Sequence, residues 1–169
     1  WAALAIRCGK NRPGGQLDAN PAQVRKEENM VTKTEIVVRY AETDQMGIAH
    51  HSNYAVWYEQ ARTEFIRHFG LSYGEMEKLG VWLPLLELNC RYGMPARYED
   101  RLVVETRIGL LTPSRIRFDY TIRKEGEEKP INQGFTQHAF TTPALRPMNL
   151  KKKFPELYQL LSDAAECND

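Results

Sequence analysis

Residues 40–54, which read YAETDQMGIAHHSNY, form a polar segment with several groups able to do chemistry. The segment ends where a helix is expected to begin. A helix N-terminus offers free backbone N–H groups and the positive end of the helix dipole, which stabilise a developing oxyanion. A carboxylate beside that point can act as a nucleophile or as a general base. Asp44 fits this role better than Glu42, because Gly47 lets the chain turn back toward the helix start.

A structural interpretation of the same residues is simpler, and composition alone favours it. Asp44 and Asn53 would then cap turns, since loop Asx residues serve the backbone more often than catalysis, and the two histidines would lie on the surface. No metal site is predicted. His50 and His51 are adjacent without an HExxH arrangement, and the three cysteines have no CxxC or Cys/His ligand spacing.

A strand and a long helix are predicted to flank this segment. Ile36, Val38 and Tyr40 alternate with polar positions, which predicts a half-buried strand that begins near residue 34. Asn53 can cap the helix and Gly70 can end it. The helix has one apolar stripe, assigned to the core: Tyr54, Trp57, Tyr58, Ala61, Phe65 and Phe69. The later elements are a short helix at 71–79, strands at 82–92, 102–111, 115–124 and 131–141, and a terminal helix at 154–161.

This order of elements predicts an α+β fold, in which the aromatic helix buries its stripe against one five-stranded antiparallel sheet. The short connections at 111–114 and 125–128 favour hairpins between the later strands. Clean alternation along 115–124 leaves one face of that strand in water. Because such a sheet has exposed edges and an uncovered far face, we expect it to pair with a second copy of the chain.

The length of 169 residues suits one domain. Residues 1–30 show no sustained hydrophobic period and are interpreted as an extension outside a single domain at 31–169. One hypothesis is that translation naturally begins at Met30, because the preceding RKEEN can be encoded by a purine-rich stretch that resembles a bacterial ribosome-binding site.

The composition limits the classes of function. The 23 basic and 22 acidic side chains leave a net charge of +1, which excludes nucleic-acid binding through general phosphate neutralisation. No apolar run approaches the roughly 18 residues that a spanning helix needs, and the first residues do not form a signal-peptide pattern. We therefore expect no membrane span and a cytoplasmic location.

Residues 40–62, YAETDQMGIAHHSNYAVWYEQAR, closely resemble the signature of 4-hydroxybenzoyl-CoA thioesterase-like enzymes of the hotdog fold, a family that includes bacterial acyl-CoA thioesterases. In that signature, a D-x-x-G-x-x-x-H/Y-x-x-Y segment precedes the central helix. The resemblance extends over about residues 34–155. It implies a long central helix wrapped by a five-stranded antiparallel sheet, and hydrolysis of an acyl-CoA or acyl-carrier-protein thioester to a carboxylic acid and a free thiol.

The resemblance also implies roles for individual residues. Asp44 takes the position of the catalytic carboxylate, which attacks the thioester carbonyl or activates a water molecule. The backbone N–H of His51 would polarise the carbonyl, and the side chains of His51 and Tyr40 match supporting polar positions. Asn53 and Tyr54, at the helix start, are candidate substrate-binding residues.

Coenzyme A carries phosphates, so a local group of cations is needed despite the balanced net charge. Ser114 with Arg115, and Arg146 near the lysines at 151–153, are candidates for this group. Coenzyme A would be part of the substrate, and no separate cofactor is expected. Active sites of the family lie between subunits, which implies a homodimer or a homotetramer.

Two other functions remain open at this point. A hotdog hydratase or dehydratase would use a histidine such as His50 or His51 with a carboxylate to move protons at carbon. A non-catalytic module would bind an acyl thioester without releasing its thiol. The acyl specificity has no signature in the sequence.

Overall fold

The computed structural model describes residues 31–166. The predicted extension at 1–30, and with it the hypothesis of a start at Met30, lies outside the described residues. The elements in chain order are β1 (Thr32–Val37), a 3-10 turn η1 (Tyr40–Glu42), α1 (Asn53–His68), α2 (Tyr73–Lys78), β2 (Leu85–Tyr92), β3 (Arg101–Thr112), β4 (Arg115–Lys124), β5 (Pro130–Ala139), α3 (Leu150–Lys153) and α4 (Pro155–Glu166).

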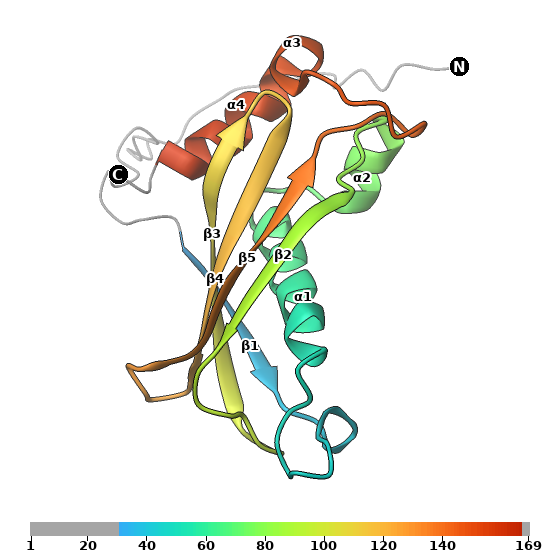
Figure 1. Ribbon diagram of the computed structural model, residues 1–169. Helices are drawn as coiled ribbons and strands as arrows, with labels where there is room; N and C mark the ends of the chain where they lie inside the picture. Colours follow the sequence, from blue (N-terminus) through green and yellow to red (C-terminus); the bar gives the residue numbers. More distant parts are fainter. Residues whose placement is uncertain (1–30, 167–169) are drawn as a thin grey trace, which may run out of the picture.

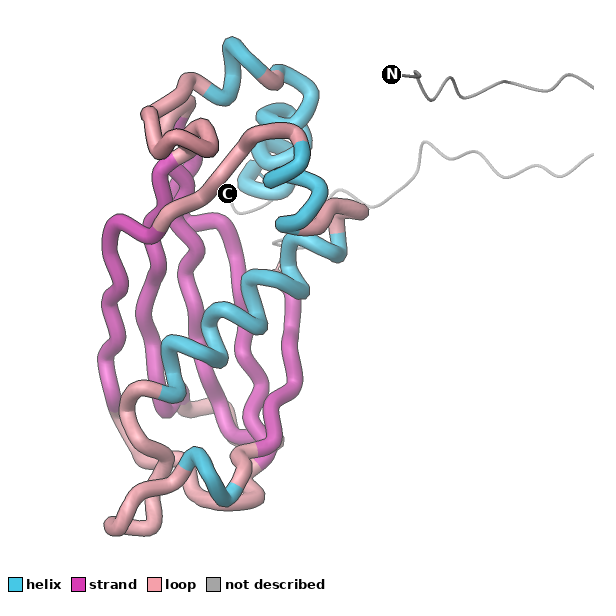
Figure 2. Tube along the Cα trace, turned by 90° about the vertical axis from the view of Figure 1, so that its right-hand side faces the viewer, coloured by secondary structure: helices cyan, strands magenta, loops and turns pink. Residues whose placement is uncertain are grey.

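The five strands form one sheet in the order β1-β3-β4-β5-β2, and every neighbouring pair is antiparallel. The long helix α1 crosses one face of this sheet, while α3 and α4 lie at one end of it (Figure 1). Figure 2 shows α1 in front of the strands, and Figure 1, seen from the opposite face of the sheet, shows no helix of residues 31–166 lying across the middle of that face. The predicted α+β architecture is therefore confirmed.

The core lies between α1 and the sheet. The apolar stripe of α1 is almost fully buried, as predicted, with Phe69 packed against its margin. The Tyr58 ring stacks on Tyr120 of β4 with 4.1 Å between ring centroids, and Phe65 meets Phe118 edge to face at 5.7 Å. These aromatic contacts fix how α1, and therefore its N-terminus, sits on the sheet.

The first strand ends earlier than its alternation predicts. β1 stops at Val37, and Tyr40, which is 77% exposed, begins the turn η1, so the placement of Tyr40 on the strand face is wrong. The cause is a local capping pair, in which the Arg39 N–H donates to Glu42 Oε2 at 2.8 Å. This bond turns the chain out of the ladder, which the alternation alone does not reveal.

The helix boundaries also differ in part. Ser52, not Asn53, occupies the N-cap of α1, while Gly70 ends the helix in a left-handed conformation (φ +74°), as predicted. The predicted terminal helix is confirmed as α4, although it starts at Pro155 and runs to residue 166 instead of spanning 154–161. The lysines at 151–153 belong to a separate short helix, α3. Proline suits the first position of a helix and cannot continue the one before it.

The strand bounds otherwise lie within a few residues of the predictions. β2 begins at Leu85 instead of position 82, because Trp82 pairs with Thr141 only as an isolated bridge. Pro84 lies between that bridge and the strand. Along β4, Ile116, Phe118, Tyr120 and Ile122 are buried and the alternate residues are not, so the predicted wet face is confirmed.

No helix within residues 31–166 is long and apolar enough to cross a membrane. The cytoplasmic location stays a prediction.

Candidate active site

The segment before α1 folds back on itself as a tight hairpin. The Asp44 N–H donates to Ile48 O at 2.9 Å, and the His50 N–H donates to Glu42 O at 2.8 Å. Gly47 closes the turn with φ +69°, and its N–H donates to Asp44 O at 2.9 Å. The reversal predicted from Gly47 is confirmed, and it returns the chain to the first turn of α1.

The Asp44 side chain is half-buried, and only one of its two carboxylate oxygens accepts a hydrogen bond. Its Oδ1 accepts the Met46 N–H at 2.8 Å, which forms an Asx turn within the hairpin. Its Oδ2 has no hydrogen-bond partner among residues 31–166. The His51 N–H, which immediately precedes the N-cap of α1, is likewise unpaired in this part of the chain. The hairpin therefore leaves a free acceptor and a free donor near the start of one helix.

Two side chains of α1 hold the hairpin in place. Asn53 Nδ2 donates to Glu42 O at 2.8 Å and to His50 O at 3.2 Å. Trp57 Nε1 donates to Glu42 Oε1 at 3.1 Å. The side chain of Asn53 therefore binds backbone carbonyls of the hairpin, which is a different role from the N-cap predicted for it.

Glu42 is a structural carboxylate. It is 4% exposed, and the Arg39 guanidinium lies 2.9 Å from its Oε1. Burial by itself raises the pKa of Glu42, but the hydrogen bonds from Arg39 and Trp57 outweigh it and hold this pKa below its usual value. Because both oxygens of Glu42 are committed, Asp44 is the carboxylate of this segment that has an oxygen free.

The loop between β2 and β3 packs against the hairpin. The Ala49 N–H donates to Ala96 O at 2.8 Å, and Arg97 Nη1 donates to Gly47 O at 3.2 Å. Tyr92, at the end of β2, donates its hydroxyl to His51 O at 3.2 Å. The amino-acid sequence alone indicates no role for Tyr92 or Arg97. Nothing in the local pattern could do so, because these contacts join residues more than 40 positions apart.

The remaining predicted residues of this end lie close by. Tyr54 is 3% exposed and meets the Tyr92 ring edge to face at 5.1 Å. Tyr40 is exposed and meets Tyr98 edge to face at 5.6 Å. Met46 is also exposed, so the hairpin end of the molecule presents several large apolar side chains to solvent.

The predicted phosphate-binding residues lie at the other end of the sheet. Ser114 is in the turn before β4, and the loop that carries Arg146 is joined to this turn through the bond from the Phe140 N–H to Ser114 O, 2.9 Å. β4 runs ten residues from Arg115 to Lys124, and Lys124 binds Asp100 beside the Asp44 end at 2.8 Å. Within one chain, the segments that carry Ser114, Arg115 and Arg146 therefore lie at one end of the sheet, whereas Asp44 lies at the opposite end.

A metal ion has no evident ligand set in this region. Within the described range, no three His, Cys, Asp or Glu side chains are grouped so that they could hold a metal. The His50 ring instead pairs with Ser52 Oγ at 2.8 Å.

A long helix held in the curve of one five-stranded antiparallel sheet is the hotdog architecture. The family model described as the thioesterase superfamily matches residues 46–131, about half of the 169 residues, and the chain belongs to this superfamily. The predicted hotdog fold and the thioester hydrolase class are therefore confirmed.

Individual relatives agree with this assignment. The Bacillus subtilis (strain 168) protein YneP, provisionally named as an acyl-CoA thioesterase, is 38% identical over 126 residues, which cover 75% of this chain and 91% of YneP. A DHNA-CoA thioesterase from Staphylococcus aureus has a similar structure, with a TM-score of 0.74, 34% identity and coverage of 79% of this chain and 89% of that one. A 4-hydroxybenzoyl-CoA thioesterase with 18% identity and a TM-score of 0.68 shares the fold.

Proposed function

We propose that this protein hydrolyses an acyl-CoA thioester to a carboxylic acid and free coenzyme A, with Asp44 as the catalytic carboxylate. The supporting observation is the pair of free polar groups before α1, Asp44 Oδ2 and the His51 N–H. The names of YneP and of the S. aureus DHNA-CoA thioesterase support an acyl-CoA substrate. Two relatives from Arabidopsis thaliana are named acyl-acyl carrier protein thioesterases, so the carrier needs a direct test.

The chemistry follows from these two groups. The thioester oxygen accepts a hydrogen bond from the His51 N–H, at the positive end of the helix dipole, and negative charge develops there in the transition state. Asp44 Oδ2 attacks the carbonyl carbon, or it takes a proton from a water molecule that attacks. The C–S bond then breaks and the electron pair leaves with the thiolate of coenzyme A. On the nucleophilic route, water next hydrolyses the anhydride formed with Asp44.

The side chains of His51 and Tyr40 orient the substrate or the attacking water in this proposal, and Tyr54 forms part of the substrate-binding wall. Asn53, predicted as a substrate-binding residue, acts instead by holding the hairpin through its bonds to Glu42 O and His50 O. Coenzyme A enters as part of the substrate, without a separate cofactor. A thiolate leaves with little need for protonation, so a Ser-His-Asp triad is not required.

We propose that the site is completed in a homodimer through β2. This strand lies at the edge of the sheet with β5 as its single neighbour among the described strands. It exposes a row of large apolar side chains, Leu85 (52%), Leu86 (50%) and Leu88 (42%). An unpaired, apolar edge strand favours pairing with an identical strand of a second copy. Two such dimers could further assemble as a homotetramer.

Antiparallel pairing about a two-fold axis reverses the direction of the second sheet. The end of the partner subunit that carries its Ser114, Arg115 and Arg146 then lies at the end where Asp44 lies in the first subunit. We propose that these cations bind the phosphates of coenzyme A while the thioester reaches Asp44. This arrangement accounts for why one chain places the two groups at opposite ends.

The decisive experiment measures thiol release with a chromogenic disulfide, using short, long and aromatic acyl-CoA esters and the corresponding acyl-carrier-protein thioesters. We expect Asp44→Asn to lower kcat/KM for the best substrate by roughly 10²-fold or more, because a central charged group of the transition state is lost. The melting temperature should stay close to that of the wild type. Glu64→Gln, an exposed carboxylate of α1, is the matched control and should retain turnover.

Near-wild-type thiol release by Asp44→Asn would reject the catalytic role. Reversible loss of the double-bond absorbance of an enoyl-CoA, without thiol release, would indicate a hydratase instead. Saturable binding of acyl-CoA without either signal would indicate a non-catalytic module.

A further inference from the structure

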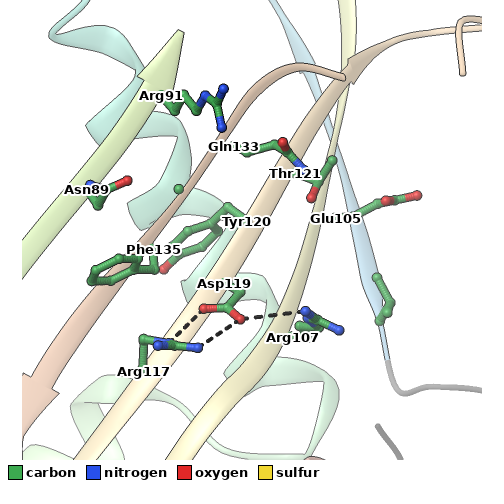
Figure 3. Close-up of a pocket in the computed structure, with 12 residues that line it drawn as sticks. Asn89, Arg91, Glu105, Arg107, Arg117, Asp119, Tyr120, Thr121, Gln133 and Phe135 are labelled. Carbon is green, nitrogen blue, oxygen red and sulfur yellow. Dashed lines mark hydrogen bonds and ion pairs between the residues drawn. The ribbon is translucent and has the colours of Figure 1, made fainter. Parts of the chain in front are cut away.

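The far face of the sheet carries a groove of about 580 Å³, on the side opposite α1 (Figure 3). Its walls come from β2, β3, β4 and β5, and Figure 3 shows the side chains of Arg91, Arg107 and Arg117 around it. The volume is in the range of small-molecule sites. The proposed thioesterase site does not use this face.

Part of the groove is held rigid by an ion cluster. The Asp119 carboxylate lies between Arg117, 2.9 Å from its Nε, and Arg107, 3.7 Å from its Nη2. Gly109 makes room for this carboxylate, because a Cβ at that position would lie 2.1 Å from Asp119 Oδ2. The Arg117 guanidinium also lies over the Phe135 ring, 5.3 Å from its centroid. Arg117 is therefore held in one orientation before any ligand arrives.

The charges in and around the groove do not balance. Asp119 is shared by two arginines, and the other carboxylate, Glu105, is bound by Lys33 at 3.8 Å and by Arg123. The Arg91 side chain has no hydrogen bond or ion pair within residues 31–166. Among the residues that line the groove, three arginines (Arg91, Arg107 and Arg117) therefore face two carboxylates (Glu105 and Asp119), an excess of one positive charge.

We propose that this groove is a binding site for an organic phosphate, separate from the site of hydrolysis. Guanidinium groups form two parallel hydrogen bonds with phosphate oxygens, and the uncommitted Arg91 together with the fixed Arg117 offers two such groups on one groove. Asn89, Gln133 and Thr121 line the space between them and suit the polar remainder of the ligand. The lining is too polar for an acyl chain.

A second copy of the chain fits this face less well. Packing two such faces together would bring the positive excess of one against that of the other, and like charges in an interface are unfavourable. A small polyanion neutralises the excess instead. Free nucleotides and the nucleotide end of coenzyme A share this chemistry, and the test separates them.

The test is isothermal titration of the intact protein at low and physiological salt, with adenosine 3′,5′-bisphosphate, ADP, coenzyme A, adenosine and inorganic phosphate as separate titrants. We expect saturable, salt-sensitive binding of the phosphorylated compounds and none of adenosine. Arg91→Gln and Arg117→Gln should each weaken binding at least tenfold. Arg67→Gln, which removes an exposed arginine of α1, should leave it unchanged.

Binding to the groove should persist in Asp44→Asn, and the KM for acyl-CoA should not change in Arg91→Gln. These two measurements test the groove and the thioesterase site separately, so a negative result for one proposal does not decide the other. Binding of coenzyme A that Arg91→Gln and Arg117→Gln weaken, without binding of free nucleotides, would identify coenzyme A as the ligand of the groove. Absence of binding, wild-type affinity in both groove variants, or a tetramer that Arg91→Glu dissociates would overturn the proposal.

Discussion

The two ends of α1 differ in what their polar groups do. At the N-terminal end, Asn53 and Trp57 bind the hairpin that contains Asp44, and one carboxylate oxygen and one N–H stay unpaired there. In the C-terminal half, Ala61, Phe65 and Ile66 are 1% exposed or less. We call the N-terminal end, where polar groups remain unpaired, the open end of α1. We call the C-terminal half, where the side chains facing the sheet are buried, the closed half.

This difference separates stability from activity along a single element. The closed half fixes the position of α1 through the burial of apolar side chains in a close-packed core. This stabilisation depends on excluding water and not on the direction of individual contacts. The open end then needs only a few directed hydrogen bonds to place Asp44. Substitutions in the closed half should therefore change folding, and substitutions at the open end should change turnover.

The largest effect is expected from Phe65→Ala. Phe65 is fully buried and packs against Phe69, 5.0 Å between centroids, and Phe118. The cavity left by the ring should lower the free energy of unfolding by about 3–5 kcal/mol, measured by urea denaturation. Turnover per folded molecule should stay near that of the wild type. Val56→Ala, at an exposed position of the same helix, should cost under about 0.5 kcal/mol. A loss of turnover as deep as in Asp44→Asn would remove the distinction between the two ends.

A smaller effect is expected from His138, which faces the closed half. It is 2% exposed, its Nδ1–H donates to Leu83 O at 3.0 Å, and its Nε2 accepts from Arg62 Nη1 at 2.9 Å. Burial and the neighbouring Arg62 charge lower the pKa of His138 to about 4, against about 6.5 when unfolded. The unfolded state therefore binds more protons between these values. The stability that the neutral imidazole contributes is present above pH 6.5 and is lost as the pH falls toward 4, by roughly 3 kcal/mol.

The measurement is urea denaturation at a series of pH values. His138→Gln should show a flatter dependence than the wild type between pH 6.5 and 4, whereas His68→Gln, at an exposed position, should keep the wild-type slope. Equal slopes in all three proteins would show that His138 is not buried in the neutral form.

Periodic features of the sequence predicted the closed half well. The stripe of α1 and the alternation of Ile116, Phe118 and Tyr120 depend on the fixed periods of a helix and a strand, so a short window contains the whole signal. The turn at Gly47 is equally local, because its positive φ favours glycine.

The open end was predicted less completely, because its geometry depends on contacts that no short window contains. Arg39 and Glu42 end the first strand early, and Tyr92 reaches His51 O from a strand 41 positions away. The distance of Arg115 and Arg146 from Asp44 likewise follows from the direction of β4. The chemical roles assigned to these residues stay predictions.

The smallest effect, and the sharpest comparison, concerns Asn53 at the open end. Asn53→Ala removes the bonds to Glu42 O (2.8 Å) and His50 O (3.2 Å), which should cost about 1 kcal/mol of stability. Because these bonds place the hairpin, kcat should fall about tenfold, equivalent to about 1.4 kcal/mol of barrier, with little change in KM. Ser52→Ala, whose hydroxyl caps no helix N–H, should leave both parameters near the wild type. A rise in KM at constant kcat would instead show that Asn53 binds substrate directly. The hairpin would then be positioned by the hydrogen bond from Trp57 to Glu42, without a contribution from Asn53.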